Sequence, residues 1–344
     1  MTSGSAMHSE ILEQPAMLAE QAANWTDQAQ AILEQLNGRR QLVLLGRGSS
    51  GNACTFAAYL HSVTSGRHPI EFRPWLVTVD DVQEADWSDC FAFAFSASGM
   101  STDISSAASW LRERGCFVVG ITNSEEPSSK LHLGSSADLI FRLAAGPEKA
   151  VPATKSFTAQ LFAAASLCGL KISSTAKQTA ECFSQILKKD VGNIVADFMG
   201  TPKNIYWLAR GYALGGALDA ALKIQETSSI DAQAYSTAEF MHGPIGAVGP
   251  DDRAIIFVDS DGPDSAADTV IAALINRKTP VMVISGTDST KSASPALYPV
   301  PFPTDRWARA AIIALVGQLA AYEYSTRLGM DPDSPRGLNK VTLT

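Results

Sequence analysis

A phosphate-binding turn is indicated by a run of hydroxyl side chains around one glycine, Ser96-Ala97-Ser98-Gly99-Met100-Ser101-Thr102-Asp103. This run follows the apolar segment FAFAF and precedes the helix-like segment DISSAASWLRER. Serine hydroxyls can donate hydrogen bonds to phosphate, a glycine lets backbone N–H groups approach it, and a helix N-terminus attracts an anion. The alternative is that these serines only cap the helix. We expect a phosphate at Ser96, Ser98 and Ser101.

A candidate proton-transfer pair lies in residues 213–227 (ALGGALDAALKIQET), where Lys223 and Glu226 are three residues apart and share one helical face. An ordinary surface ion pair is the alternative. The segment is otherwise almost uncharged, however, and Asp219 lies one turn earlier on the same face. Desolvation on an apolar helix makes a carboxylate a better base, and a neighbouring lysine keeps it ionised. We therefore interpret Glu226 as a candidate general base.

One histidine, His242, lies in a loop bounded by glycine and proline, within AEFMHGP (238–244). A lone loop histidine is usually only solvated, but its nearness to the other candidate groups favours a catalytic role. The other four are interpreted as surface or packing residues: His8, His61, His68 and His132.

The segment GRGSSG (46–51) matches the glycine pattern of dinucleotide-binding turns. Two observations argue against a nicotinamide cofactor. The acidic candidates Asp80 and Asp81 are too distant in sequence, and the related segment ARGYAL (209–214) lacks two of the three glycines. We expect no cofactor here, and we interpret Ser50 as a hydroxyl donor to a substrate.

Composition and charge exclude several classes of protein. The 344 residues carry a formal net charge of −8, with 46% hydrophobic and 18% charged residues, which argues against nucleic-acid or acidic-membrane partners. Neither a signal peptide nor a transmembrane segment is predicted, so a cytoplasmic protein is expected. No metal site is expected, because the cysteines have no metal-ligand spacing and are interpreted as structural thiols: Cys54, Cys90, Cys116, Cys168 and Cys182.

An internal repeat organises the chain. Gly48 and Gly211, each following a strand-like run, are 163 residues apart, and the same offset relates Gly99 to Gly262. It also relates the apolar run 117–121 to 280–284. The repeat places Asp259-Ser260-Asp261-Gly262 opposite the hydroxyl-rich turn, and its two carboxylates would repel phosphate. We therefore expect the phosphate in the first half only.

The elements that must position these residues alternate between strand and helix in both halves. Continuous apolar runs predict strands buried on both faces of parallel sheets. Strands are predicted at 41–46, 71–77, 90–96, 116–121, 138–143, 204–209, 254–259, 280–284 and near 298–302. Helices are predicted near 51–63, 101–114, 155–188, 213–227, 264–276 and 306–326.

This alternation predicts an α/β protein with two tandem doubly wound parallel sheets related by duplication. Ligands of such sheets bind where the carboxyl ends of the strands meet the helices, which is where the polar segments fall. The expected division is a helical arm at 1–40, domains at 41–190 and 191–330, and a tail at 331–344. By composition the tail would be disordered.

Six motifs in order resemble the isomerase half of glucosamine-6-phosphate synthase, a double sugar-isomerase (SIS) domain. Besides the hydroxyl-rich turn, they are EILEQP (10–15), VPATKSFTAQL (151–161), ALKIQE (221–226), AEFMHGP (238–244) and PRGLNKVT (335–342). The resemblance runs nearly end to end. It departs at Ala97, Ala153 and Asn339, which puts the identity of the substrate in doubt.

The resemblance implies roles for residues at matching positions. Ser50, Ser96, Ser98 and Ser101 would contact the substrate, the last three around its phosphate, and Val151 would line the sugar site.

The resemblance also implies the catalytic groups. Glu226 would move a proton between the first two sugar carbons, with Lys223 supporting it. His242 would assist ring opening and would reach in from a partner subunit of a homodimer. Lys340 would attack the open-chain carbonyl or pair with it, as the tail closes over the sugar.

The sequence contains no counterpart of the glutaminase domain of the synthase, so ammonia from glutamine is not expected. We therefore expect deamination of glucosamine 6-phosphate, or of a related amino-sugar phosphate, to a ketose 6-phosphate and ammonia, without metal or cofactor. A phosphosugar aldose–ketose isomerase without deamination is an alternative. A non-catalytic sugar-phosphate sensor is another, although the retention of Glu226, His242 and Lys340 favours an enzyme.

Overall fold

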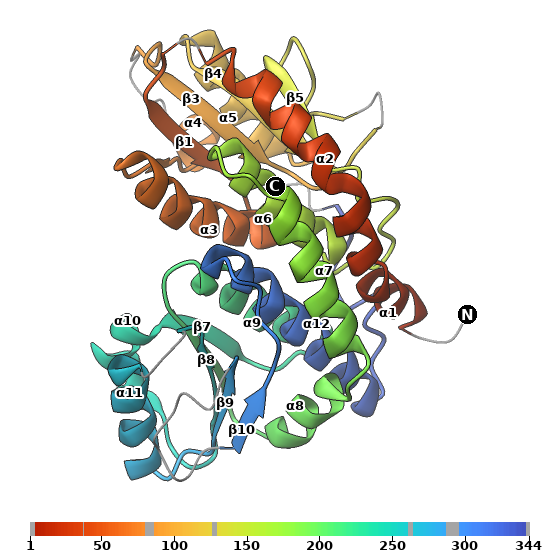
Figure 1. The fold of residues 1–344 in the computed structure, drawn as a ribbon, viewed down its shortest axis with the longest axis vertical. Coiled ribbons are helices and arrows are strands. Elements are labelled where there is room, and N and C mark those ends of the chain that lie inside the picture. The colour runs from red at the N-terminus through yellow and green to blue at the C-terminus, as the bar shows by residue number, and fades with distance from the viewer. Residues whose placement is uncertain are drawn as a thin grey trace. The chain divides into compact units, whose positions relative to one another are not determined.

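Two five-stranded parallel sheets are the centres of two compact units. The computed structural model describes residues 4–36, 38–79, 86–125, 129–260, 264–286 and 296–341 (Figure 1). The first-sheet unit consists of Ala16–Glu148, Lys155–Ala176 and Leu338–Thr344. The second-sheet unit consists of Met1–Pro15, Lys149–Thr154 and Lys177–Gly337. The prediction of two parallel α/β sheets is confirmed.

The first sheet has the strand order β2-β1-β3-β4-β5, and every neighbouring pair is parallel. All six residues of β3 are buried, as expected for an apolar run covered by helices on both faces. The strands are β1 (Gln41–Leu45), β2 (Ile70–Glu71), β3 (Cys90–Phe95), β4 (Phe117–Thr122) and β5 (Leu139–Arg142). The helices are α2 (Gln14–Leu33), α3 (Gly48–Ser65), α4 (Trp75–Thr78), α5 (Thr102–Glu113) and α6 (Lys155–Leu167).

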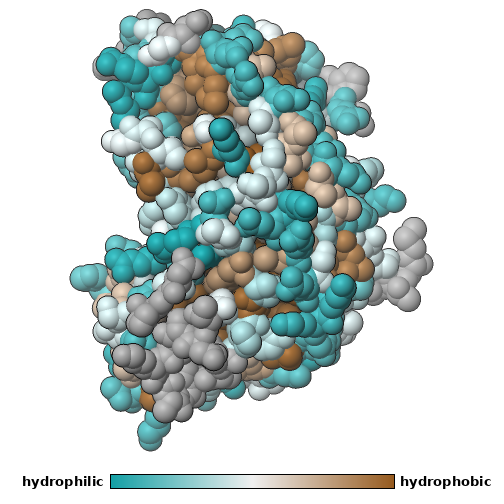
Figure 2. Space-filling view, in the orientation of Figure 1, coloured by the Kyte–Doolittle hydropathy of each residue, from teal (hydrophilic) through white to brown (hydrophobic). Residues whose placement is uncertain are grey.

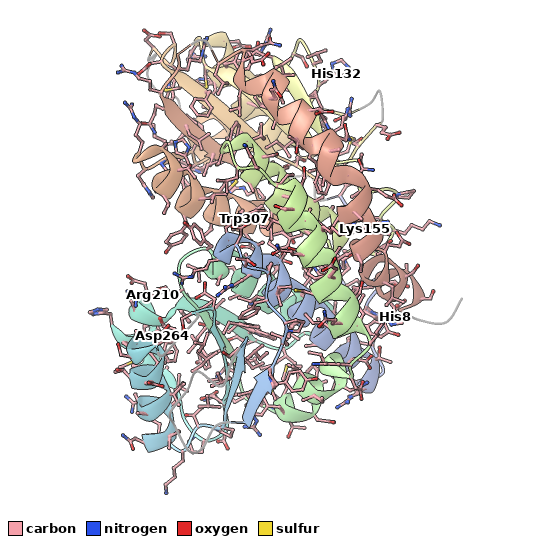
Figure 3. The ribbon with its side chains drawn as sticks, viewed as in Figure 1. His8, His132, Lys155, Arg210, Asp264 and Trp307 are labelled. Atoms are coloured by element: carbon pink, nitrogen blue, oxygen red, sulfur yellow. The ribbon has the colours of Figure 1, made fainter. Side chains whose placement is uncertain are left out.

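Every residue of helix α6 is buried, from Lys155 (labelled in Figure 3) to Leu167. The helix packs against α3. On α2, Trp25 is fully buried and its indole N–H donates to the Leu143 carbonyl at 2.8 Å. Apolar residues show in brown on the surface of this unit in Figure 2. Val63 and Trp75 are two exposed apolar residues of the unit.

The second sheet has the order β10-β9-β8-β6-β7 and is also parallel throughout. Its strands are β6 (Ile205–Ala209), β7 (Ala232–Ser236), β8 (Arg253–Val258), β9 (Val281–Ser285) and β10 (Ala296–Pro299). The helices are α1 (Ser5–Leu12), α7 (Ser173–Leu187), α8 (Val191–Met199), α9 (Ala213–Ser228), α10 (Thr237–Met241), α11 (Ser265–Asn276) and α12 (Arg309–Arg327). Short 3₁₀ turns are η1 (Pro244–Ala247) and η2 (Arg306–Ala308).

Close packing of α9 on α12 depends on small residues. A Cβ added at Gly317 would lie 2.3 Å from Ala220 Cβ, and one at Gly216 would lie 2.3 Å from the Ala310 carbonyl oxygen. On the other face, Asp264 caps α11 by accepting hydrogen bonds from the Ala266 and Ala267 N–H groups, each at 3.0 Å (Figure 3). No helix within the described ranges is both long and apolar enough to cross a membrane.

Some predicted elements are wrong. The predicted strand 71–77 is only the two-residue β2 followed by α4, because Pro74 cannot donate to a sheet and instead precedes a helix. The predicted helix 155–188 is two helices, since Gly169 adopts a left-handed φ of +83° after α6. Strand β7 was not predicted, and its mostly half-buried edge position explains the weak apolar signal. Helices α8 and α10 were not predicted either.

Several sequence interpretations concern residues that lie outside the described ranges: Asp80, Asp81, Asp261, Gly262 and residues 342–344.

The five cysteines all lie within the described ranges. Burial raises the pKa of each of the five thiols, so they remain protonated near neutral pH and behave as small packing groups. His61, interpreted as a surface or packing residue, is buried on α3 with an edge-on contact to Phe91.

Candidate active site

The hydroxyl-rich turn joins β3 to α5 at the carboxyl end of the first sheet. Ser96 is buried directly after β3, while Ser98 and Ser101 are half-buried. The Ser98 Oγ accepts a hydrogen bond from the Met100 N–H at 3.2 Å, so its own proton can be donated to a ligand. The order of the strands reverses between β1 and β3, which is where ligands bind in doubly wound sheets.

Arg47 and Asp103, to which the sequence analysis gives no individual role, stabilise this turn. The Ser101 hydroxyl donates to Asp103 Oδ1 at 2.7 Å, and Arg47 Nε donates to Asp103 Oδ2 at 2.8 Å. Burial raises the pKa of Asp103, but these hydrogen bonds and the guanidinium charge outweigh it and hold the pKa below its usual range. The Ser101 proton is therefore directed at Asp103, and it can reach a phosphate only if the hydroxyl rotates.

Both the backbone conformation at position 99 and the atoms packed around it require a glycine. Its φ is +67°, and an added Cβ would lie 2.3 Å from Ser129 Oγ. We expect Gly99→Ala to lower the free energy of unfolding by about 1–3 kcal/mol, from strain plus the clash, and to weaken phosphate binding. Denaturant unfolding measures the first effect. Gly48→Ala is the matched control, since Gly48 has a φ of +52° but no atom within 4 Å of an added Cβ. An equal loss in the two variants would contradict the clash.

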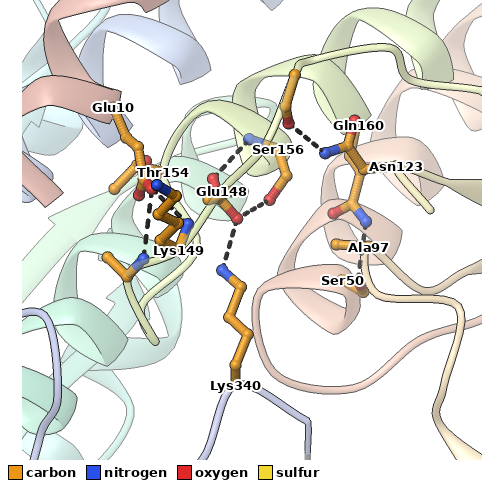
Figure 4. Close-up of polar contacts among 12 residues, drawn as sticks. Glu10, Ser50, Ala97, Asn123, Glu148, Lys149, Thr154, Ser156, Gln160 and Lys340 are labelled. Carbon is orange, nitrogen blue, oxygen red and sulfur yellow. Dashed lines mark hydrogen bonds and ion pairs between the residues drawn. The ribbon is translucent and has the colours of Figure 1, made fainter. Parts of the chain in front are cut away.

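Ser50 lies in the first turn of α3, at the carboxyl end of β1, which pairs with β3. Its buried hydroxyl oxygen accepts a hydrogen bond from Gln160 Nε2 of α6 at 2.9 Å (Figure 4). The Ser50 proton is thus left for another acceptor. Ser50 and Ser96 therefore follow adjacent strands at the same edge of the sheet, and the first-sheet unit brings together four of the predicted binding serines.

Lys340 contacts a glutamate that the sequence did not single out. Its Nζ donates to Glu148 Oε2 at 2.9 Å (Figure 4), and Glu148 also accepts from the Ser156 N–H at 3.0 Å and hydroxyl at 2.7 Å. The Glu148 side chain is 4% exposed and that of Lys340 is 32% exposed. Burial raises the pKa of Glu148, but the ammonium and the Ser156 hydrogen bonds outweigh it and hold the pKa below its usual range. Residues 338–341 are thus anchored in the first-sheet unit by a charge-assisted contact.

Lys223 and Glu226 form an ion pair on α9 of the second-sheet unit. Lys223 Nζ donates to Glu226 Oε2 at 2.5 Å. The lysine side chain is fully buried, whereas the glutamate side chain is 21% exposed, so the carboxylate is the accessible member. Asp219 is fully buried one turn earlier. The Lys223–Glu226 pair is therefore not an ordinary surface ion pair, because the Lys223 ammonium is removed from water.

His242 and Val151 also lie in the second-sheet unit. His242 follows α10. Its backbone N–H donates to the Glu239 carbonyl at 3.0 Å, and the residue is exposed. Val151 is half-buried, and its N–H donates to the Asp333 carbonyl at 2.9 Å. The Asp333 carboxylate in turn accepts hydrogen bonds from the Ala6 and Met7 N–H groups at 3.0 and 2.7 Å. The beginning of the tail is therefore hydrogen-bonded and not a free end.

The counterpart of the phosphate turn in the second sheet carries a partly neutralised carboxylate. Asp259 follows β8, and Arg306 Nη2 lies 3.3 Å from its Oδ1. Burial raises the pKa of Asp259, and the opposing charges of Arg306 and Arg309 do not overcome it. The repulsion expected from this residue is thus weakened by arginine. The expectation that phosphate binds in the first half therefore depends mainly on the hydroxyl groups of that half.

The profile of the SIS domain family matches residues 35–168 and 200–325, which together make up most of the chain. The chain belongs to the SIS domain family. Each match contains one of the two parallel sheets, so this SIS protein carries the domain twice, as the internal repeat predicted.

Named relatives of this SIS protein act in sugar-phosphate chemistry. The isomerizing glutamine–fructose-6-phosphate aminotransferase of Pyrobaculum aerophilum is 29% identical over 352 residues, covering 97% of this chain and 57% of that protein. The chain thus spans about half the length of the curated relatives it matches.

Two solved structures share the fold over nearly the whole chain. The tagatose-6-phosphate ketose/aldose isomerase of Escherichia coli has a TM-score of 0.82 at 21% identity, covering 98% of this chain and 97% of that one. The glucosamine-6-phosphate deaminase of Thermotoga maritima has a TM-score of 0.73 at 22% identity, covering 97% and 100%. At these identities the likeness concerns the fold.

Proposed function

We propose that this SIS protein is an enzyme that transfers a proton between the first two carbons of a sugar 6-phosphate. The ion pair of Lys223 with Glu226 carries the proposal, because it places a partly exposed carboxylate, the group that a general base requires, against a fully buried ammonium on α9. The hydroxyl-rich turn at Ser98 supports a phosphate ligand, and the sugar-phosphate relatives support the substrate class.

We propose further that the substrate is an amino-sugar phosphate such as glucosamine 6-phosphate. After ring opening, Glu226 would remove the C2 proton of the 2-amino aldehyde, giving an enolamine, and would return a proton to C1. The resulting 2-imine would take up one water and release ammonia, leaving fructose 6-phosphate. His242 would assist ring opening. The fold shared with the deaminase of Thermotoga maritima supports this specific form.

Isomerisation without loss of nitrogen is the second candidate, which the fold shared with the tagatose-6-phosphate ketose/aldose isomerase of Escherichia coli supports. It uses the same proton transfer between C2 and C1. We also propose a homodimer with shared active sites, in which the exposed His242 would serve the site of a second copy.

One assay separates these candidates. The protein is incubated in D₂O with glucosamine, galactosamine, fructose and tagatose 6-phosphates, while ammonia release and deuterium uptake at C1 and C2 are measured. Ammonia from an amino-sugar phosphate supports the deaminase. Deuterium uptake and aldose–ketose conversion without ammonia support the isomerase. Binding with neither reaction would identify a non-catalytic sensor and overturn the proposed catalysis.

A further inference from the structure

A loop after β4 is built against the phosphate turn. The Leu131 N–H donates to the Gly99 carbonyl at 3.0 Å, and the Ser129 hydroxyl donates to the same oxygen at 3.2 Å. Both side chains are buried, at 1% and 7% exposure. Because Gly99 has no side chain, the Ser129 hydroxyl occupies the space that a Cβ would need. Residues 129–131 therefore pack directly against the turn and are hydrogen-bonded to it.

Lys130 lies between these two anchored residues and places a cation at the start of α5. Its side chain is exposed, and its Nζ donates to the Thr102 hydroxyl at 2.6 Å. Thr102 is the first residue of α5, directly after Ser101. The ammonium is thus held at the helix N-terminus, where unsatisfied backbone N–H groups already favour an anion.

The charges around the turn do not cancel. The guanidinium of Arg47 is matched by the carboxylate of Asp103. The Lys130 ammonium donates to a neutral hydroxyl, and in the described part of the chain no carboxylate forms an ion pair with it. Among the described residues, the Lys130 ammonium is therefore a positive charge with no carboxylate in an ion pair with it, and it contacts Thr102, the residue that follows Ser101.

We propose that Lys130 binds the phosphate of the substrate, so that the site takes a doubly charged phosphate monoester in preference to a singly charged or neutral analogue. This inference rests on the sugar-phosphate function proposed above and adds a residue that no matching motif contains. A charge-assisted N–H···O contact is stronger than a neutral one and does not require the Ser101 hydroxyl to leave Asp103. Lysine suits this role because its flexible stem can carry the ammonium from Thr102 to a bound anion.

Calorimetry with glucitol 6-phosphate and glucitol 6-sulfate tests the proposal, because neither has a carbonyl to react. The wild type is compared with Lys130→Ala, Lys130→Arg and Lys171→Ala. Lys171 is an exposed lysine of the same unit and is the matched control. We expect Lys130→Ala to lower the affinity for glucitol 6-phosphate by about tenfold, the scale of one charged hydrogen bond. The affinity for glucitol 6-sulfate should fall by less. Lys130→Arg and Lys171→Ala should remain near the wild type.

Each other outcome decides against the proposal. Equal affinity in Lys130→Ala and Lys171→Ala would remove Lys130 from the site while leaving the proposed function intact. Equal weakening in Lys130→Ala and Lys130→Arg would show that the loop needs the lysine for its shape rather than for its charge. If the wild type binds no sugar 6-phosphate, the proposed function fails first, and this inference fails with it.

Discussion

Glu226→Gln is expected to lower turnover of the sugar 6-phosphate by about a thousandfold, the middle of the range for a lost general base. Glutamine has nearly the same shape, and its amide oxygen can still accept a hydrogen bond from the buried Lys223, so the fold should be kept. Steady-state kinetics give the turnover and circular dichroism melting checks the fold. Deuterium exchange at C2 should fall in parallel, because the proton transfer itself is removed.

Glu239→Gln is the matched control, because Glu239 is an exposed acid of the same unit on α10. It should retain near-normal turnover. Mixing Glu226→Gln protein with His242→Ala protein tests the shared site as well, since exchange of subunits would restore one complete site per hybrid dimer. Turnover above about a tenth of the wild type in Glu226→Gln would exclude Glu226 as the base, given the usual size of the effect.

Lys340→Ala is expected to lower turnover by at least about a hundredfold, while the protein stays folded. If Lys340 contacts the open-chain carbonyl, its loss removes a cation from the reacting centre. The anchoring of Lys340 by Glu148 adds a second expectation. Glu148→Gln should lower turnover too, because the ammonium would no longer be held in place by a carboxylate. Glu148 is thus a positioning residue in this scheme.

The double variant Glu148→Gln, Lys340→Ala separates catalysis from stability. Lys340→Ala removes the ammonium from a buried carboxylate, which costs stability, and the second substitution should recover part of that loss without recovering turnover. Near-normal turnover in Lys340→Ala would remove Lys340 from the mechanism. The ion pair of Glu148 with Lys340 also makes stability depend on pH, because the pKa of Glu148 is lower in the folded protein than in the unfolded chain. The stabilisation by Glu148 is present above the ordinary glutamate pKa. It is lost as the pH falls through the lower pKa of the folded protein.

The amino-acid sequence determined the duplicated α/β architecture, because periodicity and burial are local and repeated signals. Continuous apolar runs such as 91–95 favour strands covered on both faces, and a glycine-containing turn after such a strand falls at its carboxyl end. The positions of Ser50, Ser96 and Ser98 at one edge of the first sheet follow from that logic. The same local signals overextend the strand at β2, where Pro74 intervenes, and miss the edge strand β7.

Only the tertiary structure decided which polar side chains meet. Glu148 and Lys340 are 192 residues apart, and Arg47 and Asp103 are 56 apart, so no sequence period relates them. From the sequence alone, Lys130 is an ordinary surface lysine. In the structure, its two neighbours donate hydrogen bonds to the Gly99 carbonyl, and its ammonium contacts Thr102 at the start of α5. The physical reason is that a hydrogen bond or ion pair depends on the approach of chain segments, which the packing of the helices on the sheet sets and the local pattern does not.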